Sequence, residues 1–420
     1  MTASNQSNNS LELSCRYYPT DNLHIKFILL VIVTPIVSLY GIVGSVLAIT
    51  VFLRKQMLNC NNCYLIALAV CDIGVLSTAV LIYTVEIAYD YYGDVELYYA
   101  WVRYLRGIYF LSHLFQVGAV YMTVAATVER WFSLTYPDLA RRISTVRRTV
   151  VYIAIIFGFS FGFTLSKYFE IDIIHQAWCK GFGKYVLFAS ALARNDLYTL
   201  IHTIWLSGLL VIFIPFLLLL ILNAMITYRT VSEIRRSLIQ PQTLMTNVNS
   251  WRRESRIYRG KVREANVLLL IIVGVFLVCN IPDFILTIAE QIDITWLRQH
   301  RHLYSFAKDL VNMLTILNSA ANFTVYWMFG ADFRRQLRRN LVIAGQRIRE
   351  SSVRLRVSIK RSSRRNEIDS SVAQLDYHSD EREKLNRSPP REMYDLQMNG
   401  DVSQRANIDG TNWLVITLEL

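Results

Sequence analysis

The sequence predicts an all-α integral membrane protein: a seven-transmembrane helix bundle with a short cytoplasmic interfacial helix. The chain has 420 residues, 53% of them hydrophobic, and its mean hydropathy of +0.29 exceeds that of soluble domains. Seven apolar runs are long enough to cross a bilayer, because about 20 residues rising 1.5 Å each span the hydrocarbon core. The runs cover residues 27–53, 64–88, 107–132, 149–166, 200–227, 265–288 and 310–329.

The basic residues set the orientation of these runs. Lysines and arginines gather in the connections after the first, third and fifth runs, which the positive-inside rule places in the cytoplasm. We therefore expect residues 1–26 to be extracellular, 27–329 to form the bundle, 330–345 to form an amphipathic helix and 346–420 to be a disordered cytoplasmic tail. Asn5 and Asn8 begin glycosylation sequons on the extracellular segment.

The third run ends in Glu129, Arg130 and Trp131 at the expected cytoplasmic boundary. A cationic side chain at this position can extend to the membrane interface, and until it does so the adjacent acid can pair with it. An ordinary charged helix terminus is the alternative interpretation.

Beyond the seventh run, Phe333, Leu337 and Leu341 recur every fourth residue with arginines between them, which is typical of a helix lying in the interface plane. Residues 334–365 hold twelve Lys or Arg and one acid, so this segment is expected to contact anionic lipid. The net charge of +12 therefore indicates lipid or an acidic cytoplasmic protein rather than nucleic acid. Residues 418–420, Leu-Glu-Leu, fit a PDZ-domain ligand.

Cysteine placement separates two groups. Cys60, Cys63, Cys71 and Cys279 lie in or at the cytoplasmic ends of runs and are expected to be reduced packing residues. Cys15 and Cys179 lie on the oxidising side. A Cys15–Cys179 disulfide and two free thiols both remain open.

Seven spans with Glu129, Arg130 and Trp131 closing the third resemble the rhodopsin-like G-protein-coupled receptors. Leu68, Ala69 and Asp72 are similar to that family's LAxxD motif. The sixth run resembles FxxCWxP with Asn280 in place of tryptophan, and the seventh resembles NPxxY with Phe323 in place of proline. The resemblance implies an activation switch made of Pro215, Val120, Phe276, Asn280, Pro282, Asn322 and Tyr326, and it makes Glu129, Arg130 and Trp131 the G-protein contact.

Departures from the family pattern limit what carries over. Leu105 stands where the third-helix disulfide cysteine is usual, so the usual bridge to Cys179 is impossible. Ser112 stands where amine receptors have an aspartate, and Ile316 where opsins have the retinal lysine. Neither an amine nor retinal is therefore expected as ligand.

The resemblance also implies a polar cluster in the middle of the bundle. Asp72, Asn318, Ser319 and Asn322 supply the oxygens that a hard cation needs, so a sodium ion is the one cofactor considered. Ala119 replaces a serine often found at such sites.

The expected ligand pocket combines acids with aromatic side chains, which suits a cationic peptide end. Its predicted residues are Asp283, Glu86, Glu290, Tyr83, Ser112, Gln116 and Phe284, with Tyr104, Tyr109 and Trp205 nearby. Asp283 is the main candidate because it lies inside a span. Glu86 and Glu290 could instead be solvated charges at helix ends.

These features are together typical of a plasma-membrane receptor for an extracellular neuropeptide that activates a heterotrimeric G protein and has no catalytic chemistry. The Cys-Asn-x-Pro variant of the sixth run looks like invertebrate receptors of the FMRFamide and myosuppressin type. Arrestin and receptor kinases are the implied cytoplasmic partners. A small-molecule chemosensory receptor on the same fold and a seven-span transporter are the alternatives, although a transporter would ordinarily show internal repeats.

Overall fold

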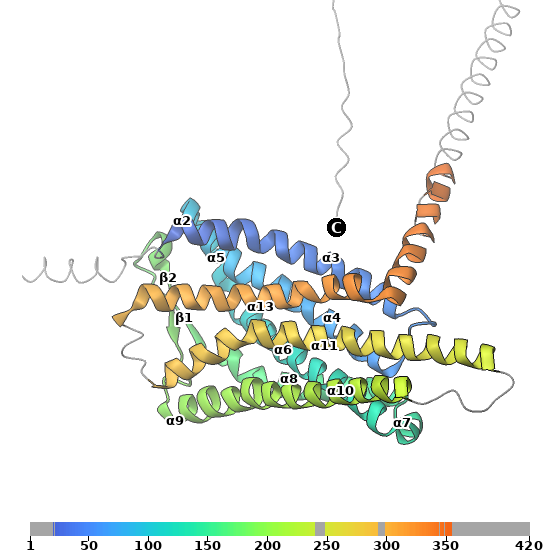
Figure 1. Ribbon diagram of the computed structural model, residues 1–420. Coiled ribbons are helices and arrows are strands. Elements are labelled where there is room, and N and C mark those ends of the chain that lie inside the picture. The colour runs from blue at the N-terminus through green and yellow to red at the C-terminus, as the bar shows by residue number, and fades with distance from the viewer. Residues whose placement is uncertain are drawn as a thin grey trace, which may run out of the picture. The chain divides into compact units, whose positions relative to one another are not determined.

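The computed structural model describes residues 20, 22–239, 248–292, 299–343, 345–347 and 349–354. Its long helices run side by side as one bundle (Figure 1). They are α2 (Leu23–Lys26) with α3 (Thr34–Phe52), α4 (Cys60–Ala79) with α5 (Val85–Tyr92), α6 (Val95–Thr135), α8 (Val146–Thr164), α10 (Ile214–Ile239), α11 (Val248–Ile292) and α13 (Arg301–Phe329). Short helices α7 (Pro137–Ile143) and α9 (Asp196–Tyr198) lie in connections. Wider π-helical turns at Phe27–Val33, Val80–Thr84, Thr199–Leu206 and Gly208–Phe213 complete the outer parts of the first, second and fifth helices.

Within the described ranges, six helices are long and apolar enough to cross a membrane. The seventh, α13, contains Lys308 and Asp309 and is less apolar. It nevertheless packs against α11, α3 and α4, and it buries Ile316, Ala320 and Tyr326. Packing therefore places α13 in the bundle, as its apolar run at residues 310–329 predicted. The predicted seven-helix architecture is confirmed.

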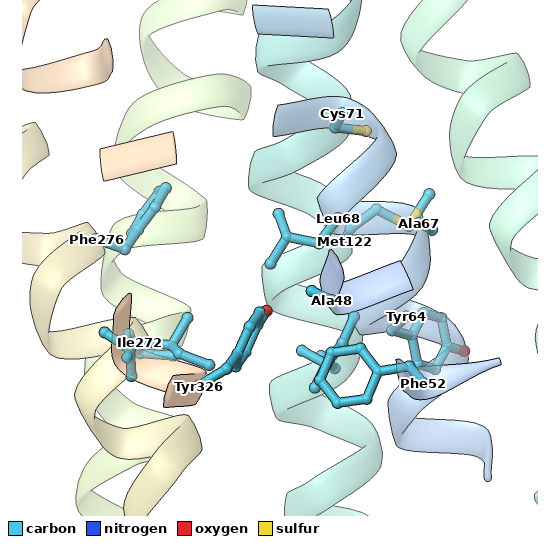
Figure 2. Packing of buried hydrophobic residues seen from close by; sticks show 14 of the residues in the cluster. Ala48, Phe52, Tyr64, Ala67, Leu68, Cys71, Met122, Ile272, Phe276 and Tyr326 are labelled. Atoms are coloured by element: carbon cyan, nitrogen blue, oxygen red, sulfur yellow. The ribbon is translucent and has the colours of Figure 1, made fainter. Parts of the chain in front are cut away.

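Helix α6 lies at the centre of the bundle and contacts α4, α5, α8 and α10. Its closest approach to α4 depends on Gly74, because a Cβ there would lie 2.3 Å from the Phe115 ring. The main apolar core lies between these helices and α11 and α13. Figure 2 shows Tyr326 of α13 between Ile272 of α11 and Phe52 of α3, and the Phe52 and Tyr326 rings are 5.2 Å apart.

A β-hairpin, which the sequence analysis did not predict, covers the N-terminal end of α6, the end expected to be extracellular. Strand β1 (Ile171–His175) pairs antiparallel with β2 (Tyr185–Ala189). The Tyr98 hydroxyl donates to the Tyr185 carbonyl at 2.6 Å, and Arg106 pairs with Asp172 at 3.1 Å. Tyr89, Tyr98 and Trp101 form a buried aromatic cluster beneath the hairpin. These contacts hold the hairpin to α6 at the place where Leu105 rules out a disulfide.

The predicted interfacial helix is present: residues 331–343 are helical. Phe333 and Leu337 are buried against the bundle, whereas Leu341 is exposed. The described residues 345–347 and 349–354 belong to a second unit and are helical, so helical structure extends past the predicted end at residue 345. The predictions for 355–420, including the PDZ ligand, and those for Asn5, Asn8 and Cys15 concern residues outside the described ranges.

Candidate functional site

Three groups of predicted residues lie at different depths of the bundle. At the end expected to be cytoplasmic, Glu129, Arg130 and Trp131 occupy the last turns of α6 and are partly buried. Trp131 packs against the main core, and its ring meets Tyr136 edge to face at 6.3 Å. The Ser133 hydroxyl is 3.5 Å from Glu129 Oε1. Packing of Trp131 thus fixes the end of the helix that carries Arg130.

In the middle of the bundle, the Asp72 carboxyl is buried with 1% exposure. Its Oδ2 accepts a hydrogen bond from Asn322 Nδ2 at 2.8 Å, and Ser319 also interacts with it. Oδ1 is buried with no hydrogen-bond partner. Asp72, Ser319 and Asn322 are thus brought together, whereas no contact among the described residues places Asn318 at this carboxyl, and a sodium ion held by these oxygens stays a prediction. The described residues contain no group of three His, Cys, Asp or Glu that could hold a metal ion.

Three of the seven predicted switch residues meet in the core between α6, α11 and α13. Val120, Phe276 and Tyr326 belong to one buried cluster, and Pro215 is buried on α10. Pro282 lies inside α11, where it removes one backbone hydrogen bond. The Asn280 side chain folds back onto its own helix and donates to the Phe276 carbonyl at 2.7 Å. The Asn280 side chain therefore finds its hydrogen-bond partner within α11.

On the outer side of this core, Asp283 is partly buried on α11. Its neighbour Phe284 stacks on Phe216, with ring centroids 5.8 Å apart and planes 3° from parallel. Within the part of the chain that the structure describes, Asp283 makes no hydrogen bond or ion pair. It is therefore a carboxylate inside the bundle that a ligand cation could bind.

Glu290 differs from Asp283 because the protein already engages it. Its Oε1 accepts from the Tyr304 hydroxyl at 2.8 Å and lies 3.4 Å from Lys308 Nζ. The sequence reading considered Glu290 as a ligand contact or a solvated charge. The structure instead makes it a link between α11 and α13.

A third acid, Glu86 on α5, is partly buried near an ion pair that the sequence reading missed. Lys26 Nζ lies 3.2 Å from Asp309 Oδ2 and donates to Ser305 Oγ at 3.0 Å. Lys26, Asp309 and Glu86 all interact electrostatically. Lys26 and Asp309 are 283 residues apart in sequence. Nothing in the first and seventh apolar runs indicated that these two side chains would form a pair.

The remaining predicted pocket residues differ in their surroundings. Tyr83 interacts electrostatically with Tyr109, Glu86, Asp309 and Asp283, so it lies among the acids. Ser112 and Gln116 are partly buried on one face of α6, four residues apart. Trp205 is 66% exposed, and its expected contribution of aromatic surface near the pocket stays a prediction. The Tyr104 hydroxyl donates to the Leu81 carbonyl at 3.0 Å, which holds that ring against the second helix.

A second polar group closes the outer ends of the fourth and fifth helices. Glu170 accepts from Lys167 at 2.8 Å and from the Tyr198 hydroxyl at 2.9 Å. Burial raises the pKa of Tyr198 to about 12; a bond with Ser166 opposes that rise and Glu170 adds to it. The hydroxyl therefore stays protonated and donates to Glu170 at physiological pH.

The cysteines agree with the predicted division where the structure describes them. Cys60, Cys63, Cys71 and Cys279 are free thiols. Cys179 is disulfide-bonded. Because Cys15 lies outside the described residues, the Cys15–Cys179 pairing stays a prediction.

A family model and several known receptors match this chain. The family model described as "7 transmembrane receptor (rhodopsin family)" matches residues 44–326. The FMRFamide receptor of Drosophila melanogaster is 27% identical over 320 residues, which are 75% of this chain and 54% of that receptor. The FMRFamide peptide receptor frpr-18 of Caenorhabditis elegans is 25% identical over 314 residues, 72% and 66% of the two chains. The thyrotropin-releasing hormone receptor of Gallus gallus is 29% identical over 176 residues, 41% and 42% of the two.

The match thus spans 54% of the length of the Drosophila relative and 66% of the length of the nematode one. The family match itself covers all the motifs on which the resemblance rests, from the second helix to Tyr326. This chain belongs to the rhodopsin family of seven-transmembrane receptors.

Proposed function

We propose that this protein is a plasma-membrane receptor, with its N-terminus outside, that binds an extracellular neuropeptide and activates a heterotrimeric G protein. The relatives named above include receptors for FMRFamide and for thyrotropin-releasing hormone, which supports a peptide ligand. The observation that carries the proposal is Asp283, a partly buried carboxylate beside the stacked Phe284 ring. A carboxylate with aromatic surface next to it suits a guanidinium group.

The proposed ligand carries an arginine near an amidated C-terminus. The arginine gains a charge-assisted pair with Asp283, and the neutral amide avoids burial of a second, unpaired charge. Tyr83, Ser112 and Gln116 would line its path, whereas Glu290 is held by Tyr304 and Lys308. Glu290 is therefore the natural control position.

The test is a panel of amidated peptides that includes FMRFamide, scored by calcium and cyclic AMP in transfected cells. Each active peptide is compared with a form in which neutral citrulline replaces arginine. Breaking a buried charge pair costs about 2–5 kcal/mol, so Asp283→Ala should lower agonist potency by tens-fold or more. Glu290→Ala should shift it only slightly. Activation by neutral or acidic small molecules alone would overturn the peptide assignment in favour of chemosensation.

The proposed G-protein contact is Arg130, supported by its place in the last turns of α6. Arg130→Ala should abolish coupling and leave surface expression and agonist binding intact. Arg339→Ala is the matched control, since that arginine is exposed on the interfacial helix. Normal signalling by Arg130→Ala would remove the assignment.

The other proposed partners rest on the sequence. The basic segment 334–365 would lie along anionic lipid, where each cation contributes about 1 kcal/mol. Phosphorylation of its serines by receptor kinases would reduce that charge and create an arrestin-binding surface. A PDZ protein would bind residues 418–420, and glycans would occupy Asn5 and Asn8.

A further inference from the structure

The outer ends of the first, second and seventh helices carry a charge cluster that the peptide–Asp283 pair does not use. Lys26 closes α2, Glu86 lies at the start of α5, and Asp309 lies in the third turn of α13. The Lys26 and Asp309 side chains are 14% and 17% exposed, so their 3.2 Å ion pair is largely withdrawn from water. Such a pair responds strongly to the loss of one partner, unlike a surface pair.

The charges in this cluster do not balance. Lys26 neutralises Asp309, while Glu86 makes no hydrogen bond or ion pair of its own among the described residues. Glu86 feels the attraction of Lys26 and the repulsion of Asp309 and Asp90. The backbone N–H of Thr20 already donates to Asp90 at 2.8 Å. Lys26 is therefore shared by two carboxyl groups but is paired with Asp309, so Glu86 has no ion-pair partner of its own among the described residues, which is costly for a partly buried carboxylate.

The cluster itself indicates which chemical group can bind beside Glu86. An ammonium group, that of Lys26, is already held there by a carboxylate and a hydroxyl. Tyr83 interacts with Glu86 and Asp309 and also with Asp283, so the cluster adjoins the proposed arginine subsite. A ligand that reaches Asp283 can therefore present a second cation to Glu86.

We propose that Glu86 is a second cation subsite, which binds the ligand's N-terminal ammonium, and that the Lys26–Asp309 ion pair keeps this subsite open. Asp309 holds Lys26 away from Glu86. The cluster of two acids and one lysine then accepts one further positive charge. This inference rests on the proposed function, because it assigns a second part of the same peptide.

The probe is the most potent peptide of the amidated panel that has a free N-terminus, compared with its N-acetylated form. In the wild type, acetylation should lower potency about tenfold or more, because it removes one partner of a partly buried charge pair. In Glu86→Gln, the free peptide should lose potency and acetylation should have little further effect. Surface expression and potency of a panel member without an N-terminal charge serve as controls for folding.

The decisive variants concern the ion pair. Asp309→Asn releases Lys26, which should turn to Glu86 and abolish the preference for the free N-terminus. Lys26→Gln combined with Asp309→Asn should restore that preference, since Glu86 is then unpaired again. A purely structural ion pair would predict no such rescue.

The outcomes separate the two proposals. If no peptide of the panel activates the wild type, the proposed function fails and this inference fails with it. If the peptide activates the wild type but acetylation lowers potency equally in the wild type, Glu86→Gln and Asp309→Asn, the proposed function stands and the second subsite is refuted. Failure of the double variant to regain the preference likewise refutes the role of Lys26.

Discussion

Two residues that depart from the family pattern are accommodated by their immediate neighbours. Phe323 stands in place of the seventh-helix proline, and a Cβ at Gly44 would lie 2.5 Å from its ring. Gly44 thus leaves the space on the first helix that the larger side chain needs. Asn280 bonds to the Phe276 carbonyl of its own helix. Each departure changes a local contact and leaves the bundle intact.

At Asp72, the unpaired Oδ1 leads to a prediction about sodium. Sodium bound there would favour the inactive state, so NaCl in place of N-methylglucamine chloride should lower agonist affinity several-fold. Asp72→Asn should remove this sodium dependence. Ser38→Ala is the control, because the Ser38 hydroxyl is also buried and unpaired but carries no charge. Equal sodium dependence in the wild type and Asp72→Asn would show that the cluster is only structural.

Gly74 gives a packing prediction at the same scale. A methyl group there would lie 2.3 Å from the Phe115 ring, so Gly74→Ala should overpack the contact between α4 and α6 and destabilise the protein by about 1–3 kcal/mol. Gly158→Ala is the matched control, because a Cβ at that helical glycine meets nothing within 4 Å. Thermal unfolding of the purified receptor would measure both. Equal stability of the two variants would contradict the close approach.

Among the elements, the β1–β2 hairpin is held to α6 by packing, at a place where related receptors usually have a disulfide. Trp101 is 4% exposed, and its indole donates to the Ile82 carbonyl at 3.2 Å. It joins α6 to the second helix directly beneath the hairpin. Tyr98 then reaches the Tyr185 carbonyl. The aromatic cluster thus positions the hairpin on α6 without a cysteine at Leu105.

This account predicts unequal roles for two tryptophans. Trp101→Ala should cost about 3–5 kcal/mol, because it removes a buried aromatic side chain. Trp178→Ala should cost little, since Trp178 is 64% exposed in the loop between the strands. Thermal unfolding in detergent would compare them. A similar loss in both variants would mean that the cluster does not anchor the hairpin.

The same loop carries Cys179, and we expect its partner to be Cys15. Such a bond would tether the N-terminal segment to the hairpin over the outer pocket. Peptide mapping under non-reducing conditions should recover a linked pair of peptides, and reduction should separate them. Recovery of Cys15 as an alkylated free thiol would exclude the pairing.

For the whole molecule, apolar run length and periodicity were sufficient to predict the bundle and the interfacial helix. Phe333 and Leu337, spaced by one helical repeat, are buried on the same face of this helix, whereas Leu341 is exposed. The hairpin and the Lys26–Asp309 pair could not be predicted in this way. Both depend on segments that meet only after the helices pack, and a single sequence records no such pairing. For the same reason, the bonds of Glu290 to Tyr304 and Lys308 could not be predicted, although its place near the end of the sixth run already ranked it below Asp283.

The orientation of the whole molecule follows from charge and can be tested independently of any ligand. Arginines and lysines after the first, third and fifth helices should stay in the cytoplasm, because they resist translocation. An epitope at the N-terminus should then be stained on intact cells, and one at the C-terminus only after permeabilisation. Removal of N-glycans by an amidase should lower the apparent mass of the wild type but not of Asn5→Gln combined with Asn8→Gln. A C-terminal epitope stained on intact cells would reverse the topology and, with it, the assignment of Asp283 to the ligand side and Arg130 to the G-protein side.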